Sequence, residues 1–227
     1  MNKIKHIHFI LILTVCFISC RKKDVKIPSM GYEYFPTEIG KYVIYKVDSI
    51  VYDDFYIPVK IDTFSFLVKE MIDAELEKTA NKKTLRVVRF IKKTDTTDWE
   101  INKATMHQLT TSTAERVEDN QRYIKLIFPP AENKTWNGNA YNTMGEQKYK
   151  YKNVNKKIEL NTFIFDTTLT VIQQDEENLI EKFYIEEKYA SGVGLIYKKN
   201  TSLKTEVSGN IKSGFDVTYT ITQFGKE

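Results

Sequence analysis

Side chains that act as nucleophiles, bases or metal ligands are scarce in this chain of 227 residues. The only cysteines, Cys16 and Cys20, lie near the N-terminus. His107 is the one histidine outside the first twenty residues. A Ser-His-Asp or Cys-His site needs a base beside its nucleophile, and a zinc site needs several His or Cys ligands. We therefore read His107 as an ordinary strand residue and expect no cofactor, no metal and no such catalytic site.

Carboxylates are the chemical groups that the sequence does supply in number. Asp53-Asp54 and Asp175-Glu176-Glu177 are clusters, but neither has the D-x-[DN]-x-[DN]-G spacing of a calcium loop, so solvated turns are the simpler interpretation. Two carboxylates that hydrolyse a sugar need no sequence motif. A carboxylate-dependent hydrolase therefore stays open, although only Trp99 and Trp136 offer indole rings as sugar platforms.

The first twenty residues have the order of a secretory signal. Lys3 and Lys5 give a basic start, and residues 7–18 form an almost unbroken apolar run. The run is about a dozen residues long, whereas roughly 20 are needed to span a bilayer. The pattern predicts a signal peptide over residues 1–19.

The end of that run, Phe17-Ile18-Ser19-Cys20, resembles the lipobox of bacterial lipoproteins. The resemblance implies acyl chains on Cys20, and more than one chain makes a stable membrane anchor. Phe17 departs from the Leu that the family prefers, and Cys16 is a poorer site because Val15 precedes it. No Asp follows Cys20, which by the same resemblance favours the outer membrane. A cleaved signal that releases a free protein is the alternative, and no A-x-A site supports it.

Composition limits the partners of the mature chain. The sequence has 34 basic and 30 acidic residues, and the loss of Lys3 and Lys5 with the signal leaves 32 basic residues. This near-neutral balance gives no field that would favour nucleic acid. With 41% hydrophobic and 13% aromatic residues the chain can bury a core. We expect a lipidated tether over residues 20–30 and a single, monomeric domain over residues 31–227.

Alternation of apolar and polar residues with a period of two covers most of that domain, most clearly in residues 41–52, 62–71 and 147–154. Short polar turns separate these segments. The pattern predicts a mainly β fold, an antiparallel meander of about ten strands that forms a half-barrel or a lipocalin-like or sandwich domain, with at most one or two short helices. We expect residues 73–83 to form a charged connection and residues 105–117 one strand, whereas residues 179–189 fit a helix or a strand equally.

Aromatic side chains share one face of several predicted strands. They would either line a cavity for an apolar ligand or fill the core, and we favour the core because large side chains fill small barrels without help. Trp136, in the turn-rich loop 133–144, would either be an exposed contact or pack in the core and anchor the loop, and we favour the packed role. The candidate ligand-facing residues are Phe64, Phe66, Trp136, Tyr149, Tyr151, Phe163 and Phe165.

Three segments together resemble uncharacterised bacterial outer-membrane lipoproteins. They are Tyr34-Phe35-Pro36 with the GKYVIY of residues 40–45, the FPP of residues 128–130 with the WNGN of residues 136–139, and Tyr189-Ala190 with the GVGLIYK of residues 192–198. The resemblance implies a single β-rich domain and supplies neither an activity nor catalytic residues.

The sequence therefore predicts a non-enzymatic cell-envelope lipoprotein that binds a protein or another envelope component. The first alternative is a carrier or sensor for an apolar, lipid-like ligand, and the second is the hydrolase. An apolar cavity of several hundred cubic ångströms would favour the carrier. Two carboxylates facing each other roughly 5 to 10 Å apart would favour the hydrolase.

Overall fold

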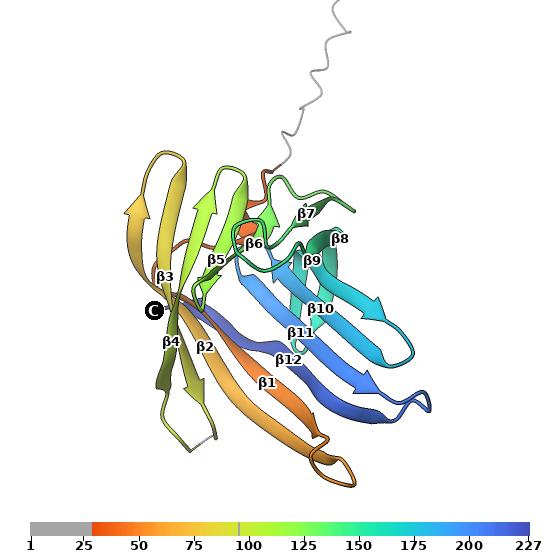
Figure 1. Cartoon of the computed structure of the whole chain (residues 1–227). Coiled ribbons are helices and arrows are strands. Elements are labelled where there is room, and N and C mark those ends of the chain that lie inside the picture. The colour runs from red at the N-terminus through yellow and green to blue at the C-terminus, as the bar shows by residue number, and fades with distance from the viewer. Residues whose placement is uncertain (1–28, 95) are drawn as a thin grey trace, which may run out of the picture.

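A computed structural model describes residues 29–94 and 96–227 (Figure 1). The predicted signal peptide, Cys20 and all but the end of the tether lie outside the described residues. The described part holds one 3-10 turn, η1 (Tyr32–Tyr34), and twelve strands. Within it, no helix has the length and apolar character needed to cross a membrane. The strands are β1 (Lys41–Asp53), β2 (Lys60–Lys78), β3 (Lys82–Lys92), β4 (Glu100–Thr110), β5 (Thr113–Glu118), β6 (Gln121–Ile127), β7 (Thr135–Asn137), β8 (Lys148–Leu160), β9 (Phe163–Glu177), β10 (Glu181–Ala190), β11 (Gly194–Thr205) and β12 (Ile211–Lys226).

All twelve strands belong to one antiparallel sheet that curls into a nearly closed barrel (Figure 1). Its order is β6-β5-β4-β3-β2-β1-β12-β11-β10-β9-β8-β7, so the first and last strands pair with each other in the middle of the sheet. Two meanders, β1 to β6 and β7 to β12, are thereby joined along β1 and β12. The prediction of a mainly β antiparallel meander is confirmed, and the predicted number of strands was too low.

The seam between β6 and β7 is bridged by single hydrogen bonds rather than by a ladder. The Ile124 N–H donates to the Gly138 carbonyl at 2.9 Å, and the Trp136 indole N–H donates to the Ile124 carbonyl at 2.9 Å. The Tyr151 hydroxyl donates to the Ile127 carbonyl and accepts from its N–H, both at 2.8 Å. These contacts give the exposed edge of β6 the partners that a neighbouring strand would supply.

Three local expectations are corrected. Residues 73–83 do not form a charged connection, because β2 continues to Lys78 and its carboxylates pair across the sheet with β3, as in Asp73 with Arg86 at 2.6 Å. Residues 105–117 are split into β4 and β5 by a turn in which the Thr110 hydroxyl accepts the N–H groups of Ser112 and Thr113. The ambiguous stretch 179–189 is a strand, β10, paired on both sides.

The N-terminal segment before β1 closes one end of the barrel. Tyr34 and Phe35 are buried there and pack in one cluster with Tyr151, Leu169 and Val171. Each fully buried apolar side chain of this kind contributes about 1.5–3 kcal/mol relative to an exposed one. The Tyr34 hydroxyl donates to the Asn155 side-chain oxygen at 2.7 Å, which fixes the segment against β8. This closed end is where the cavity described next is found.

Candidate ligand-binding cavity

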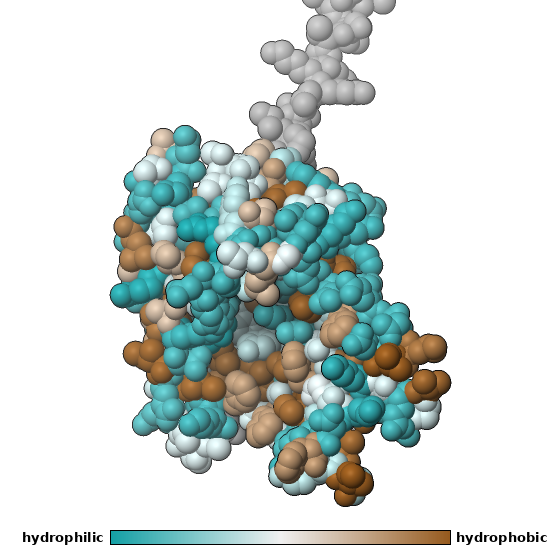
Figure 2. Space-filling view, in the orientation of Figure 1, coloured by the Kyte–Doolittle hydropathy of each residue, from teal (hydrophilic) through white to brown (hydrophobic). Residues whose placement is uncertain are grey.

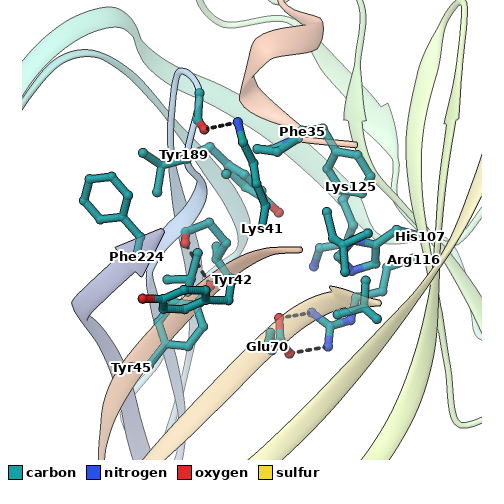
Figure 3. A pocket seen from close by; sticks show the side chains of 18 of the residues that line it. Phe35, Lys41, Tyr42, Tyr45, Glu70, His107, Arg116, Lys125, Tyr189 and Phe224 are labelled. Atoms are coloured by element: carbon teal, nitrogen blue, oxygen red, sulfur yellow. Dashed lines mark hydrogen bonds and ion pairs between the residues drawn. The ribbon is translucent and has the colours of Figure 1, made fainter. Parts of the chain in front are cut away.

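A cavity of about 360 Å³ lies inside the barrel beneath the N-terminal segment (Figure 3). This volume falls within the range of small-molecule sites, roughly 300–1,000 Å³. We call it the entrance cavity. Its walls are mainly apolar because inward positions of several strands meet there with the N-terminal segment. The apolar wall residues are Phe35, Val43, Ile72, Val87, Leu195 and Phe224.

Four charged residues at the floor of the entrance cavity pair with one another and with two more charges beneath them. We call this set the charged belt: Glu70, Arg116, Lys125 and Glu187 line the cavity, and Arg89 and Glu118 lie beneath it. Glu70 on β2 accepts from Arg116 at 2.7 Å (Figure 3). It also accepts from Arg89 at 2.7 Å. Arg116 also lies 3.1 Å from Glu118. Every one of these charges is desolvated, and each is therefore tolerated only with a partner of opposite sign.

A second group in the belt centres on Glu187 of β10. Its carboxylate accepts from Lys125 at 2.7 Å and from the Tyr189 hydroxyl at 2.6 Å. Lys198 lies 3.9 Å away on the same carboxylate. Glu187 is 2% exposed, so these three contacts replace the water that it loses on folding.

The pKa values of the belt follow from this arrangement. Burial alone would raise the pKa of Glu70, but Arg116 and Arg89 hold it well below its usual range. For Glu118 burial opposes Arg116 and Lys103, and the cations prevail and lower its pKa to about 2. Burial lowers the pKa of Lys125 to about 8 against the opposing effect of Glu187. At neutral pH the carboxylates of Glu70 and Glu118 are therefore ionised, which makes them poor proton donors.

Beyond the belt lies a smaller space of about 260 Å³, which we call the polar chamber. Tyr123, Tyr149, Gln173, Lys198 and Tyr219 line it together with belt residues. The Gln173 side chain is buried, and its Nε2 has no hydrogen-bond partner among the described residues. The belt thus separates an apolar space from a polar one.

The mouth of the entrance cavity lies at the start of β1 and the end of β12. Lys41 and Lys226 are direct partners in the β1–β12 ladder. The Lys41 ammonium donates to the Gly192 carbonyl at 3.1 Å across the opening (Figure 3), and both lysines contact Glu38, at 3.1 and 3.3 Å.

The structure scatters the aromatic residues singled out from the sequence. Tyr149 lines the polar chamber, and Tyr151 is buried in the core, where Trp136 packs against both. Phe163 and Phe165 pack on Phe224 behind the cavity wall.

The other two candidate aromatics lie on β2, away from the cavity wall. Phe66 packs beside Tyr45, Val47 and Val68. Phe64 is 53% exposed nearer the other end of the barrel. None of the seven candidates lines the entrance cavity.

The belt residues were missed because strand alternation was used only to find apolar faces. Glu70 follows Phe66 and Val68 at steps of two on β2, and Arg89 follows Leu85 and Val87 in the same way on β3. A charge that continues an apolar face was the available signal of a buried ion pair.

His107 of β4 lies at the edge of the entrance cavity, with its ring 4.9 Å from that of Phe35. Burial and the nearby Arg116 lower its pKa to about 3, so it is neutral at pH 7. Its Nε2 has no partner within the described part of the chain. No nucleophile is hydrogen-bonded to this ring in that part of the chain. The same residues contain no group of three or more His, Cys, Asp or Glu placed to hold a metal ion.

No protein-family model and no curated protein matches this chain. Among solved structures, it is similar to a Bacteroides fragilis protein described as exported and as having a YmcC-like fold, with 9% identity over 83% of this chain and 98% of that chain and a TM-score of 0.41. It is also similar to a Parabacteroides distasonis protein described as a lipoprotein, with 8% identity over 85% of this chain and 98% of that chain and a TM-score of 0.43.

Proposed function

We propose that the protein binds a small, largely apolar molecule inside its barrel and holds it without transforming it. The observation that carries this proposal is the entrance cavity, about 360 Å³ of space with mainly apolar walls inside the barrel. Protein interiors are close-packed, and a space of this size is much larger than the small voids they usually leave. The sequence analysis favoured a core filled by aromatic side chains. The cavity instead supports the alternative of a carrier or sensor for an apolar ligand.

The chemistry of the cavity supports binding over catalysis. Its two carboxylates, Glu70 and Glu187, are each committed to buried cations, and both have lowered pKa values. A glycosidase needs one carboxylic acid with a raised pKa to protonate the leaving group. The ion pairs therefore weigh against the hydrolase.

Native mass spectrometry of the chain from residue 21 onward tests the proposal. All twelve strands lie within residues 41–226, so this chain carries the whole sheet. We expect a bound mass of a few hundred daltons that organic solvent removes. The variant V193W places a ring in the cavity wall and should reduce occupancy at least about tenfold. V207W, at a hairpin tip that is 77% exposed, is the matched control and should keep the ligand. Equal occupancy in both variants would contradict a ligand in this cavity.

We further propose that the domain works in the cell envelope, anchored to the outer membrane through acyl chains on Cys20. The lipobox resemblance and the apolar run before it support this part. In cells fed labelled palmitate, wild-type protein should carry the label and fractionate with membranes. C20A should lose the label. If C20A and wild type are labelled equally, lipidation at Cys20 is wrong.

A second candidate function, docking of an envelope protein, rests on a different end of the molecule. Three neighbouring hairpin tips at the end opposite η1 carry exposed apolar side chains, and Figure 2 shows hydrophobic surface at that end. The residues are Phe55 and Ile57 between β1 and β2, Leu179 between β9 and β10, and Val207 between β11 and β12. Apolar patches on soluble domains often mark interaction sites. Crosslinking in the envelope should give a partner band that F55S/I57S loses and that I101S, at another exposed position, keeps.

A further inference from the structure

The charges around the entrance cavity are unevenly distributed between its mouth and its floor. At the mouth, Lys41 and Lys226 stand directly opposite each other on β1 and β12, an arrangement that repels. Within residues 29–94 and 96–227, the carboxylate that these lysines contact is that of Glu38, which both share. Two lysines therefore share one carboxylate at the mouth, while the neighbouring Glu227 pairs with Lys69.

The floor of the entrance cavity is a less favourable binding site for an anionic group than the mouth is. Arg116 and Lys125 face the cavity, but Glu70 and Glu187 face it beside them and accept their hydrogen bonds. An acidic group placed there would displace one of these carboxylates or lie against it without water between. At the mouth, Lys41 is 27% exposed and Lys226 is 57% exposed, so an anion keeps part of its hydration.

From this geometry we propose that the ligand is an anionic amphiphile whose acidic group binds Lys41 and Lys226 at the mouth and whose apolar part fills the entrance cavity. This inference rests on the proposed function and names its ligand class. The carboxylate or phosphate replaces Glu38 as the partner of the lysines and relieves their repulsion.

The length of the apolar part follows from the strand that runs along the cavity. Lys41 marks the mouth and Tyr45, beside the belt, marks the floor. Four residues of strand span about 13 Å at roughly 3.3 Å per residue. A medium-chain acyl group or a compact ring system matches this depth, whereas a long straight chain would have to fold back or extend past the mouth.

A pair of probes with one tail and two headgroups tests the inference on the chain from residue 21 onward. Decanoate and decanol would each displace a neutral, apolar fluorescent dye from the protein. We expect decanoate to bind about fivefold more tightly, since a charge-assisted hydrogen bond to a partly exposed lysine favours the anion. K41M and K226M should reduce decanoate to the affinity of decanol, and E38Q should raise the affinity for decanoate by about the same factor. Decanol should bind all variants alike.

The matched control is K46M on the same strand, because Lys46 is 54% exposed and does not line the cavity. It should leave the preference for the acid unchanged. Equal affinity of the two probes for the wild type would overturn the anionic ligand and leave the binding cavity intact. A preference for the acid that survives both K41M and K226M would overturn the seat at the mouth. Failure of dye and both probes to bind would contradict the proposed function itself.

Discussion

The entrance cavity and the polar chamber are built by the same strands yet offer opposite environments. Val43 and Ile72 line the first, whereas Tyr219 and Gln173 line the second. The difference arises within a few residues along each strand, at the level where Glu70, Arg116 and Glu187 cross the interior. A buried layer of ion pairs can thus divide one barrel into two compartments, of which only one suits an apolar ligand.

Breaking the belt should have the largest effect on this division. E70L leaves Arg116 and Arg89 with Glu118 as the carboxylate that they still share, and because two buried cations then face one anion we expect it to cost about 3–5 kcal/mol of unfolding free energy. Urea unfolding measures it. Removing the exposed partner in the Lys60–Asp62 pair with D62N should cost under about 1 kcal/mol. Similar costs for the two variants would show that the belt is not a desolvated network.

Filling the wall of the polar chamber should come next. A Cβ on Gly138 would overlap the ring of Tyr149, so G138A should cost about 1–3 kcal/mol through overpacking. Gly145 has no heavy atom near the position of a Cβ, which makes G145A the control. Thermal unfolding compares the two variants. An unchanged melting temperature for G138A would mean that Tyr149 moves freely in the chamber.

As the pH falls, protonation linked to His107, beside the entrance cavity, should lower the stability before protonation of the belt carboxylates does. His107 has a folded pKa of about 3 against 6.5 when unfolded, so the unfolded state binds the extra proton first and stability falls as the pH drops from 6.5 towards 3. At pH 5 the loss is about 2 kcal/mol. H107L should be level between pH 6.5 and about 4.5 when unfolding is followed at several pH values. Glu118, with a folded pKa of about 2, adds its loss only below about 4.5. An H107L curve parallel to that of the wild type would contradict the buried, neutral imidazole.

The smallest effect is expected in the polar chamber. Gln173 has a buried amide nitrogen without a partner in the described structure, so Q173L should change stability by under about 1 kcal/mol and in the stabilising direction. Native mass spectrometry should find the same bound mass as in the wild type. Loss of the ligand in Q173L would place the ligand beyond the belt and undo the contrast between the two spaces.

Alternation alone was enough to predict the sheet, because β1 and β2 each keep one apolar face over most of their length. It could not predict that β1 pairs with β12, since that pairing joins residues that are far apart in the chain. The cavity could not be predicted from the sequence either, because its walls come from residues that are far apart in the chain. Val87 and Leu195 are unremarkable strand residues until the sheet curls and leaves space between them. The paired lysines at the mouth likewise meet only through the pairing of the two outermost strands of the sequence.

The pairing of β1 with β12 also has a consequence for how the chain is made. The strand that joins the two meanders, Ile211–Lys226, begins about 160 residues after the end of β1. During synthesis β1 can pair with β2 early, but its other edge is covered only after β12 has been made. Premature termination in the loop before β12 would therefore leave two separate sheets, β1 to β6 and β7 to β11. The edges of β1 and β11 would be uncovered and could pair with another chain.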